Sequence, residues 1–468
     1  MPKGKFFRYA IGGVVTPILG LITIPLLSWV FSPSQLGEMN LFLVIVTGIT
    51  LVFSFGLDQG LIREYERSKA LPLVMEILFY ISLVFIITYF ILFSIENETL
   101  LKNKIFTENI LFEVFLTAFL LLLIRFNMVV MRMEEYALAF SLTQIVRKLS
   151  ILITLSVSFY LYKNNLFESL INVINLQLYS ALITTIFSFF VLFPFFKSFK
   201  YSRSKKFKKC FSFGWPLTFS GLLFWGLTSL DRFYISYFTS MSDLGVYSLA
   251  VSFAAIIIIV QTIFSTIWIP IIYKWYEQKS ASFLYSYTEK LVVLILIFIY
   301  FLILLFSPLI KFFIPESYYD SIVMLSFVSL YPLFYTITEV SGIGINLSKK
   351  TKLMIPIMIS TTIINLSSLA WFVPVYGALG AAASLAVTFY FYFLIKSILS
   401  NRFTPENIKT GLKTYVLCTL ILIISFFNVF ISYYFSLLLM FLLLIYVLYD
   451  FFTMPNLKEF YYEWTKEI

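Results

Sequence analysis

The sequence contains no histidine and only two cysteines, Cys210 and Cys418. The lack of histidine excludes histidine-based catalytic triads, histidine–zinc sites, haem ligation through histidine and imidazole proton relays. The two cysteines lie in distant segments, so we expect both to act as small apolar residues rather than to form a disulfide. We therefore expect no metal site, no catalytic residue and no bound cofactor.

Charge is scarce as well. Charged residues make up 12% of the 468 residues, whereas hydrophobic residues make up 60%. A soluble domain has about 25% charged and 45–50% apolar residues, so this chain lacks the polar surface to cover a soluble core. The composition excludes a soluble enzyme, a nucleic-acid-binding domain and a disordered protein. It predicts a polytopic membrane protein.

Apolar runs of about 20 residues, the length needed to cross a bilayer, recur through the whole chain. They are continuously apolar, which predicts helices rather than the alternating strands of a membrane barrel. The first run is too long for a cleavable signal peptide. We expect an all-α protein with about fourteen transmembrane helices, near residues 9–31, 39–62, 74–95, 110–131, 143–162, 171–196, 211–237, 244–270, 289–312, 321–345, 353–375, 377–399, 413–432 and 434–452.

The net charge of +10 is explained by orientation in the membrane. If the N-terminus is cytoplasmic, 29 of the 34 lysine and arginine residues fall in or beside cytoplasmic segments. Cytoplasmic loops carry such an excess of basic residues, so we expect both termini in the cytoplasm. No loop is long enough to fold as a separate extramembrane domain.

Two features divide the chain into halves. The segment 197–209, KSFKYSRSKKFKK, has seven basic residues and no acidic one, and residues 32–41 match residues 240–249 at five of ten positions. Both copies are predicted on the outer side, which indicates a parallel pseudo-repeat of two six-helix lobes. We expect an N-terminal lobe, a cytoplasmic linker, a C-terminal lobe, and a final helix pair with a cytoplasmic tail, over residues 1–196, 197–210, 211–400 and 401–468.

Three stretches carry a resemblance to a known family. They read FGLDQGLIREY at 55–65, LDRFYI at 230–235 followed by LGVYS at 244–248, and PVYGALGAAA at 374–383. In their order and topology over residues 1–400 the chain resembles the polysaccharide-export flippases, the O-antigen (Wzx-type) branch of the multidrug/oligosaccharidyl-lipid/polysaccharide exporter superfamily.

The resemblance implies a function. Its members move a polyprenyl-pyrophosphate-linked oligosaccharide, such as an O-antigen or capsule repeat unit, from the inner to the outer leaflet of the plasma membrane by alternating access. We also expect membrane lipids and other polysaccharide-assembly proteins as partners, and Na⁺ or H⁺ as a coupling ion.

A pyrophosphate crossing the bilayer requires a cationic cavity, and arginine suits this ligand because its planar donors are always charged. An intramembrane charge is costly and is therefore a functional candidate. Arg125 is foremost, and Arg63, Arg8 and Asn127 are further candidates for the substrate cavity. Simpler interpretations stay open: Arg125 reaching the inner surface, a surface pair of Arg63 with Glu64, Arg8 as a membrane anchor, and Asn127 in a helix–helix hydrogen bond.

Embedded acidic residues suggest coupling or gating. Asp58 and Glu339 are candidates for binding the coupling ion or for neutralising an arginine. Asp231 and Arg232 are candidates for an outer gate. Because adjacent residues do not face each other on a helix, we expect these two to have separate partners.

The first helix contains Pro17 and Pro25. Proline kinks a helix and frees a carbonyl, so we expect this helix to bend during transport.

Two other functions compete with the flippase. The first is a cation-coupled exporter of drugs or small molecules with the same fold. The second, more distant, is a membrane-embedded polysaccharide polymerase or glycosyltransferase, an enzyme class for which the chain has neither a large extramembrane loop nor an acidic metal-binding cluster. A cavity rich in arginine would favour the flippase, and a cavity lined by acidic and aromatic residues the exporter.

Overall fold

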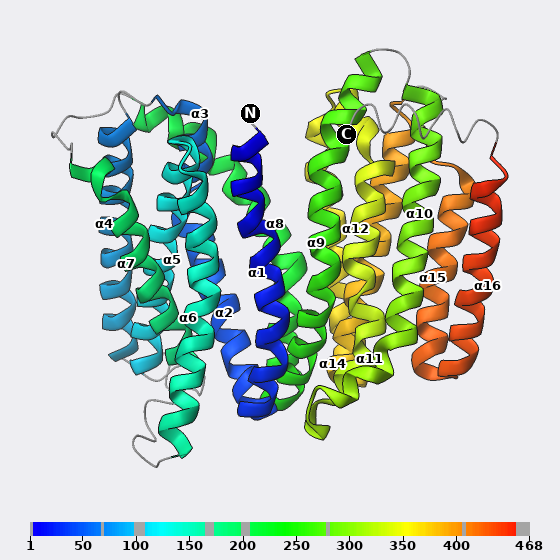
Figure 1. Ribbon diagram of the computed structural model, residues 1–468, viewed down its shortest axis with the longest axis horizontal. Helices are drawn as coiled ribbons and strands as arrows, with labels where there is room; N and C mark the ends of the chain where they lie inside the picture. Colours follow the sequence, from blue (N-terminus) through cyan, green and yellow to red (C-terminus); the bar gives the residue numbers. More distant parts are fainter. Residues whose placement is uncertain are drawn as a thin grey trace. The chain divides into compact units, whose positions relative to one another are not determined.

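The computed structural model describes residues 3–66, 70–97, 108–163, 173–197, 206–277, 281–404 and 409–454 (Figure 1). All regular structure in these ranges is helical. The chain separates into two compact units, Met1–Gly226 and Leu227–Ile468. Their boundary falls inside one helix, α8 (Phe207–Phe238), and not in the basic segment, of which residues 198–205 lie outside the described ranges. The four predicted domain ranges therefore stay a prediction.

The first unit is built around α5, which packs against α2, α4, α6 and α7, while α1 packs mainly on α6. The apolar core lies between these helices and includes fully buried residues of α2, α4 and α5. The helices of this unit before α8 are α1 (Lys3–Val30), α2 (Pro33–Ser54), α3 (Leu57–Glu64), α4 (Ala70–Asn97), α5 (Glu108–Met133), α6 (Ala137–Lys163) and α7 (Val173–Lys197).

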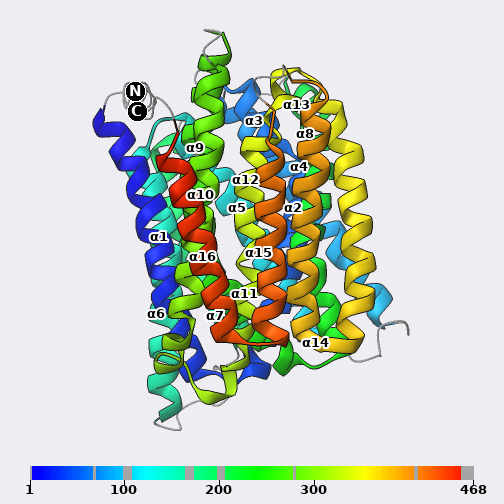
Figure 2. The same cartoon turned by 90° about the vertical axis from the view of Figure 1, so that its right-hand side faces the viewer.

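In the second unit α9, α11, α12 and α14 pack on one another, and α10, α15 and α16 form a neighbouring group (Figure 2). Its elements after α8 are α9 (Met241–Glu277), α10 (Ala281–Phe306), η3 (Ser307–Phe312), η4 (Glu316–Tyr318), α11 (Asp320–Val328), α12 (Leu330–Ser341), α13 (Ile343–Leu347), η5 (Thr351–Leu353), α14 (Met354–Asn401), α15 (Leu412–Phe430) and α16 (Tyr433–Phe452).

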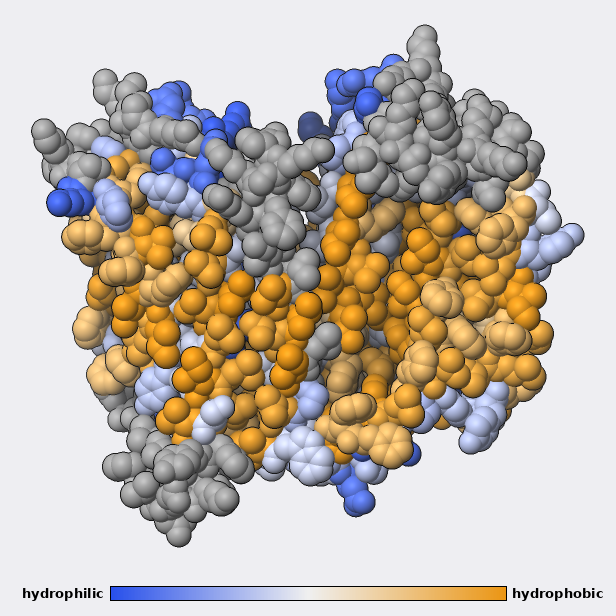
Figure 3. All heavy atoms as spheres, viewed as in Figure 1, coloured by the Kyte–Doolittle hydropathy of each residue, from blue (hydrophilic) through white to orange (hydrophobic). Residues whose placement is uncertain are grey.

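Within the described residues, twelve helices are long and apolar enough to cross a membrane. On the face drawn in Figure 3, hydrophobic residues form the middle band and hydrophilic residues gather nearer its two ends. The chain is therefore an all-helical polytopic membrane protein. Twelve differs from the predicted fourteen in two places: α1 is not counted, and the stretch 351–401 is counted once although Gly377, with φ 59° and ψ −138°, interrupts α14 within it.

The two copies of the repeated motif have the same local structure. Ser32 caps α2, its hydroxyl accepting from the backbone N–H of Gln35 at 3.4 Å, and Ser240 accepts in the same way from Asp243 at 3.1 Å, just before α9. Serine side chains at this position satisfy a helix's first free N–H groups. The repeat therefore marks an equivalent helix start in each unit.

The final helix pair is held to α10 by polar contacts. The Glu289 carboxylate accepts from the Thr414 hydroxyl at 2.6 Å and from the backbone N–H of Gly411 at 3.3 Å, at the start of α15. Asp450 of α16 lies 2.5 Å from the Lys413 ammonium and 3.7 Å from that of Lys290. One carboxylate from α10 and one from α16 thus join three helices.

Both cysteines are free and buried, Cys210 in α8 and Cys418 in α15. The expectation of two small apolar residues without a disulfide is confirmed.

Candidate functional site

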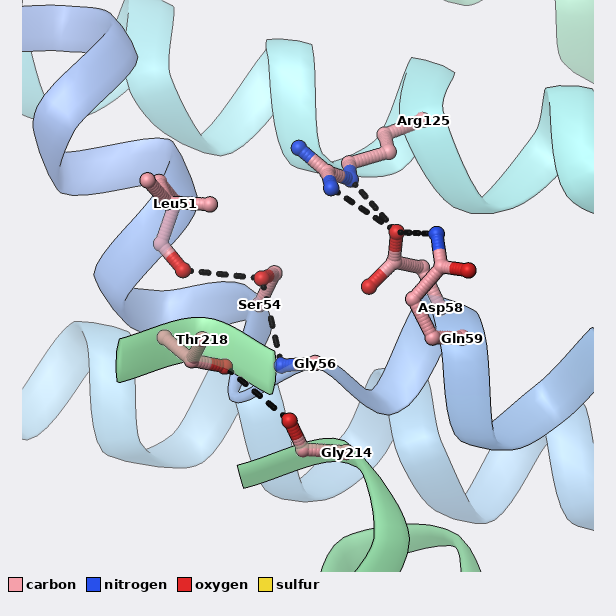
Figure 4. A network of polar contacts seen from close by, with 8 residues as sticks. All are labelled: Leu51, Ser54, Gly56, Asp58, Gln59, Arg125, Gly214 and Thr218. Carbon is pink, nitrogen blue, oxygen red and sulfur yellow. Dashed lines mark hydrogen bonds and ion pairs between the residues drawn. The ribbon is translucent and has the colours of Figure 1, made fainter. Parts of the chain in front are cut away.

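Arg125 and Asp58 form an ion pair inside the first unit. Nε and Nη2 of Arg125 donate to Oδ2 of Asp58 at 3.1 and 2.8 Å, and the Gln59 amide donates to the same oxygen at 3.1 Å (Figure 4). The Asp58 side chain is 4% exposed and that of Arg125 37%. Oδ1 of Asp58 is buried and has no hydrogen-bond partner in the described part of the chain. Arg125 lies within a candidate span, as α5 continues past it to Met133.

A break in the helix places Asp58 opposite Arg125. The sequence predicted one helix over 39–62, but α2 ends at Ser54, and Phe55 and Gly56 have positive φ angles of 47° and 62° before α3 begins. Asp58 then lies in the first turn of α3, where the positive end of the helix dipole favours a carboxylate. The turn therefore redirects the chain and places the Asp58 carboxylate at the N-terminal end of α3.

The same turn is packed directly against α8. A Cβ atom on Gly56 would lie 2.0 Å from the carbonyl oxygen of Gly214, and one on Gly60 would lie 2.4 Å from that of Cys210. Ser54 accepts from the Gly56 N–H at 3.3 Å (Figure 4). Only glycine fits where two backbones approach so closely. The contacts of Gly56 and Gly60 with α8 therefore fix the position of Asp58, which lies between them in the sequence.

Two other predicted cavity arginines lie on different helices. Arg63, near the end of α3, is 58% exposed, and its guanidinium lies 4.3 Å from the centre of the Phe213 ring and 3.9 Å from Glu64. Arg8 falls within α1 and not before it, and its side chain is outside the described part of the structure. A role in substrate binding stays a prediction for both.

Asn127 is fully buried between α5 and α7. Its amide nitrogen donates to the Ser188 hydroxyl at 2.9 Å, while its oxygen has no partner among the described residues. This is the geometry of a helix–helix hydrogen bond. A sugar contact at Asn127, which stays a prediction, would require this packing to open.

The expectation of separate partners for Asp231 and Arg232 is wrong. Nη1 of Arg232 lies 2.8 Å from Oδ1 of Asp231, because the long side chain turns back along α8 and also donates to the Thr228 carbonyl at 2.5 Å. Tyr247 of α9 donates to the other Asp231 oxygen. Tyr247 was not among the predicted site residues, although it belongs to the LGVYS stretch. The pair fastens α8 to α9, and its gating role stays a prediction.

Glu339 lies on α12, where its Oε2 is buried without a hydrogen-bond partner among the described residues. Its backbone carbonyl accepts from the Trp268 indole at 3.3 Å. Pro17 and Pro25 both fall inside the helix α1, and the Pro25 carbonyl accepts from the Ser28 hydroxyl at 2.8 Å. Ion coupling at Glu339 and bending at the prolines stay predictions.

A model of the family described as "Polysaccharide biosynthesis protein" matches residues 4–275. No curated protein matches the sequence.

Solved structures share the fold at low sequence identity. The lipid II flippase MurJ in an inward closed conformation is 17% identical, with a TM-score of 0.66, covering 95% of this chain and 97% of that one. An inward-facing MATE family multidrug resistance transporter of the MOP superfamily is 13% identical, with a TM-score of 0.60, covering 88% and 99%. A MOP superfamily transporter from Pyrococcus furiosus is 14% identical, with a TM-score of 0.51, covering 86% and 95%. These likenesses establish a fold of the MurJ and MATE type.

Proposed function

This chain belongs to the polysaccharide biosynthesis protein family, and from that premise we propose that it is a flippase for a polyprenyl-diphosphate-linked oligosaccharide. It is a multi-pass membrane transporter with the fold of the MOP superfamily and not an enzyme. The cargo is an O-antigen, capsule or similar repeat unit, which moves from the inner to the outer leaflet of the plasma membrane. Other polysaccharide-assembly proteins supply it and take it up.

The observation that carries this proposal is the Arg125–Asp58 pair inside a membrane span. A diphosphate and its sugars must cross a region where an unpaired charge is expensive, so the transporter needs a cation that is both embedded and reachable. Arg125 is embedded and 37% exposed, whereas Asp58 is almost fully covered. The substrate therefore meets the guanidinium before it meets the carboxylate.

The pair also gives a mechanism for exchange. Without substrate, Asp58 accepts hydrogen bonds from two nitrogens of Arg125, and this ion pair lowers the free-energy cost of placing the arginine charge in the membrane. A diphosphate carries more negative charge than one carboxylate and matches the planar guanidinium, so it competes for the same donors. Asp58, thus released, is free to take up H⁺ or Na⁺, which would couple flipping to an ion gradient, with Glu339 as a second candidate.

The proposed transport cycle is alternating access between two lobes. In this scheme there are fourteen spans, with α1 as the first and with α14 counted as two helices on either side of Gly377. Bending of α1 at Pro17 and Pro25 and opening of the Asp231–Arg232 contact accompany the change between inward and outward states.

Deletion of the gene tests the function. We expect loss of the surface polysaccharide and accumulation of lipid-linked repeat units in the inner leaflet, both reversed by the wild-type gene. Arg125→Gln should fail to restore export, whereas Arg132→Gln, which removes an exposed arginine from the same helix, should restore it. Unchanged surface glycan together with new drug sensitivity would instead favour the exporter, the function suggested by the MATE-like fold.

A further inference from the structure

One helix of the second unit exposes a single narrow stripe. Nine of the twelve residues of α12 are buried, and the three that are not are Tyr331, Tyr335 and Glu339. Their spacing of four residues places them one above another on the same face. A stripe facing lipid would be apolar, whereas two phenols and a carboxylate in a membrane span indicate a face on a polar route.

The second half of α14 lies against this stripe and completes two aromatic pairs. The rings of Tyr331 and Phe389 have centres 4.3 Å apart, and those of Tyr335 and Tyr392 are stacked at 6.0 Å with an interplanar angle of 14°. Phe389 and Tyr392 are buried, so they support the two partly exposed tyrosines from behind. Tyr331 and Tyr335 therefore form a supported aromatic platform.

One helical turn beyond Tyr335 and Tyr392, the charged residues Glu339 and Lys396 extend this row of side chains. Nζ of Lys396 lies 5.4 Å from the centre of the Tyr392 ring and donates to its hydroxyl at 3.4 Å, and the ammonium interacts electrostatically with Glu339. The lysine stem packs on Gly342, where a Cβ atom would lie 2.6 Å from its Cε. The row thus ends in a positioned cation that has Glu339 as an electrostatic partner.

The order of the groups along the row matches a lipid-linked saccharide. Lys396 lies near the end of α14 that is predicted to face the cytoplasm, the side of Lys349, Lys350 and Lys352. A diphosphate anchored in the inner leaflet would sit at that level, with its sugars extending towards the middle of the membrane. There the aromatic platform begins.

We propose that Tyr331 and Tyr335 stack on pyranose rings of the cargo while Lys396 binds its diphosphate. The inference rests on the proposed function and names a second set of binding residues, on α12 and α14 of the second unit. The C–H face of a pyranose suits the electron-rich face of a tyrosine ring. Glu339 balances Lys396 when no diphosphate is present, as Asp58 does for Arg125.

Two probes separate the sugar from the diphosphate: farnesyl diphosphate, and farnesyl diphosphate carrying one N-acetylglucosamine. Binding is measured by calorimetry on the full chain in lipid nanodiscs. Tyr335→Leu should weaken binding of the sugar-bearing probe by about tenfold, the loss typical of a well-packed aromatic contact, and should leave farnesyl diphosphate within about twofold. Tyr335→Phe keeps the ring and should bind both probes like wild type. Lys396→Gln should weaken both by the same factor.

A matched control is Tyr434→Leu, which removes an exposed tyrosine of α16, a helix outside the row. It should change neither affinity. If Tyr335→Leu weakens binding of both probes equally, Tyr335 has a structural role and the platform is overturned. The platform is also overturned if Tyr335→Leu has no effect on binding, or if Tyr335→Phe weakens binding as much as Tyr335→Leu does. If the wild-type protein binds both probes and the variants bind them equally well, the platform alone fails. If the wild-type protein binds neither probe, the proposed function fails as well.

Discussion

Asp58 and Arg125 are unequal partners, and this inequality predicts how each responds to mutation. Asp58 is 4% exposed and Arg125 37%. An uncompensated buried charge is costly, whereas an arginine with access to water or head groups can be solvated. The loss of Arg125 should therefore destabilise the protein more than the loss of Asp58.

A double-mutant cycle measures this difference. Arg125→Gln should lower the free energy of unfolding by about 2 kcal/mol, less than for a fully buried pair because Arg125 is partly exposed. Asp58→Asn should cost less than half as much, and the double variant less than Arg125→Gln alone. Thermal unfolding of the purified variants gives the values. Equal costs for the two single variants would contradict the arrangement described here.

The sequence was sufficient to single out both members of this pair, but not their contact. A charge within an apolar run is visible in one dimension, while Asp58 and Arg125 are 67 residues apart and meet only after α2 breaks. The Asp231–Arg232 contact was missed although the two residues are adjacent. The rule that neighbouring residues point apart on a helix concerns the direction of their Cβ atoms, and the long arginine side chain can still turn back to reach Asp231.

At the scale of the helices, the apolar runs predicted the position of nearly every long element. The interruption after Ser54 was not foreseen, because the run stays apolar through Phe55 and Gly56 and a lone glycine is compatible with a helix. In contrast, the break at Gly377 coincides with the predicted boundary between 353–375 and 377–399, where Pro374 precedes the glycine. Hydropathy locates spans, whereas kinks depend on tertiary contacts such as that of Gly56 with Gly214.

We expect Gly56→Ala to disturb this turn. A side chain at φ 62° is strained, at a cost of about 1–2 kcal/mol, and its Cβ would collide with the Gly214 carbonyl, so the total loss of unfolding free energy should exceed 2 kcal/mol. Because Asp58 follows two residues later, export should fall as well. Export and thermal unfolding are measured on the same variant.

Gly411→Ala is the matched control. Gly411 has a φ of −72°, and no atom lies within 4 Å of an added Cβ. Its N–H bond to Glu289 is kept by alanine. This variant should unfold within about 1 kcal/mol of wild type, because glycine is preferred to alanine at the N-cap of a helix but no packing contact is lost. A Gly56→Ala protein that is as stable as this control would show that the turn tolerates a side chain.

At the scale of the whole molecule, the repeat and the distribution of charge point to one orientation. The equivalent serine caps before α2 and α9 occur 208 residues apart, so the chain between them must cross the membrane an even number of times if the repeat is parallel. The basic residues independently favour a cytoplasmic N-terminus. Together they predict that both caps lie on the outer face.

Accessibility of single cysteines tests this orientation. The native Cys210 and Cys418 are buried, so they give little background in intact cells. Ser34→Cys and Ser242→Cys, equivalent positions beside the two caps, should both react with a membrane-impermeant maleimide, because both are predicted to lie outside. Lys350→Cys, exposed between α13 and α14, should react only after the cells are opened. Labelling of only one of the two serine variants in intact cells would mean an inverted repeat. Labelling of Lys350→Cys alone in intact cells would mean that the topology is the reverse of the predicted one. Labelling of Lys350→Cys in intact cells would also place Lys396 at the outer face and remove the match between the tyrosine row and a substrate entering from the cytoplasm.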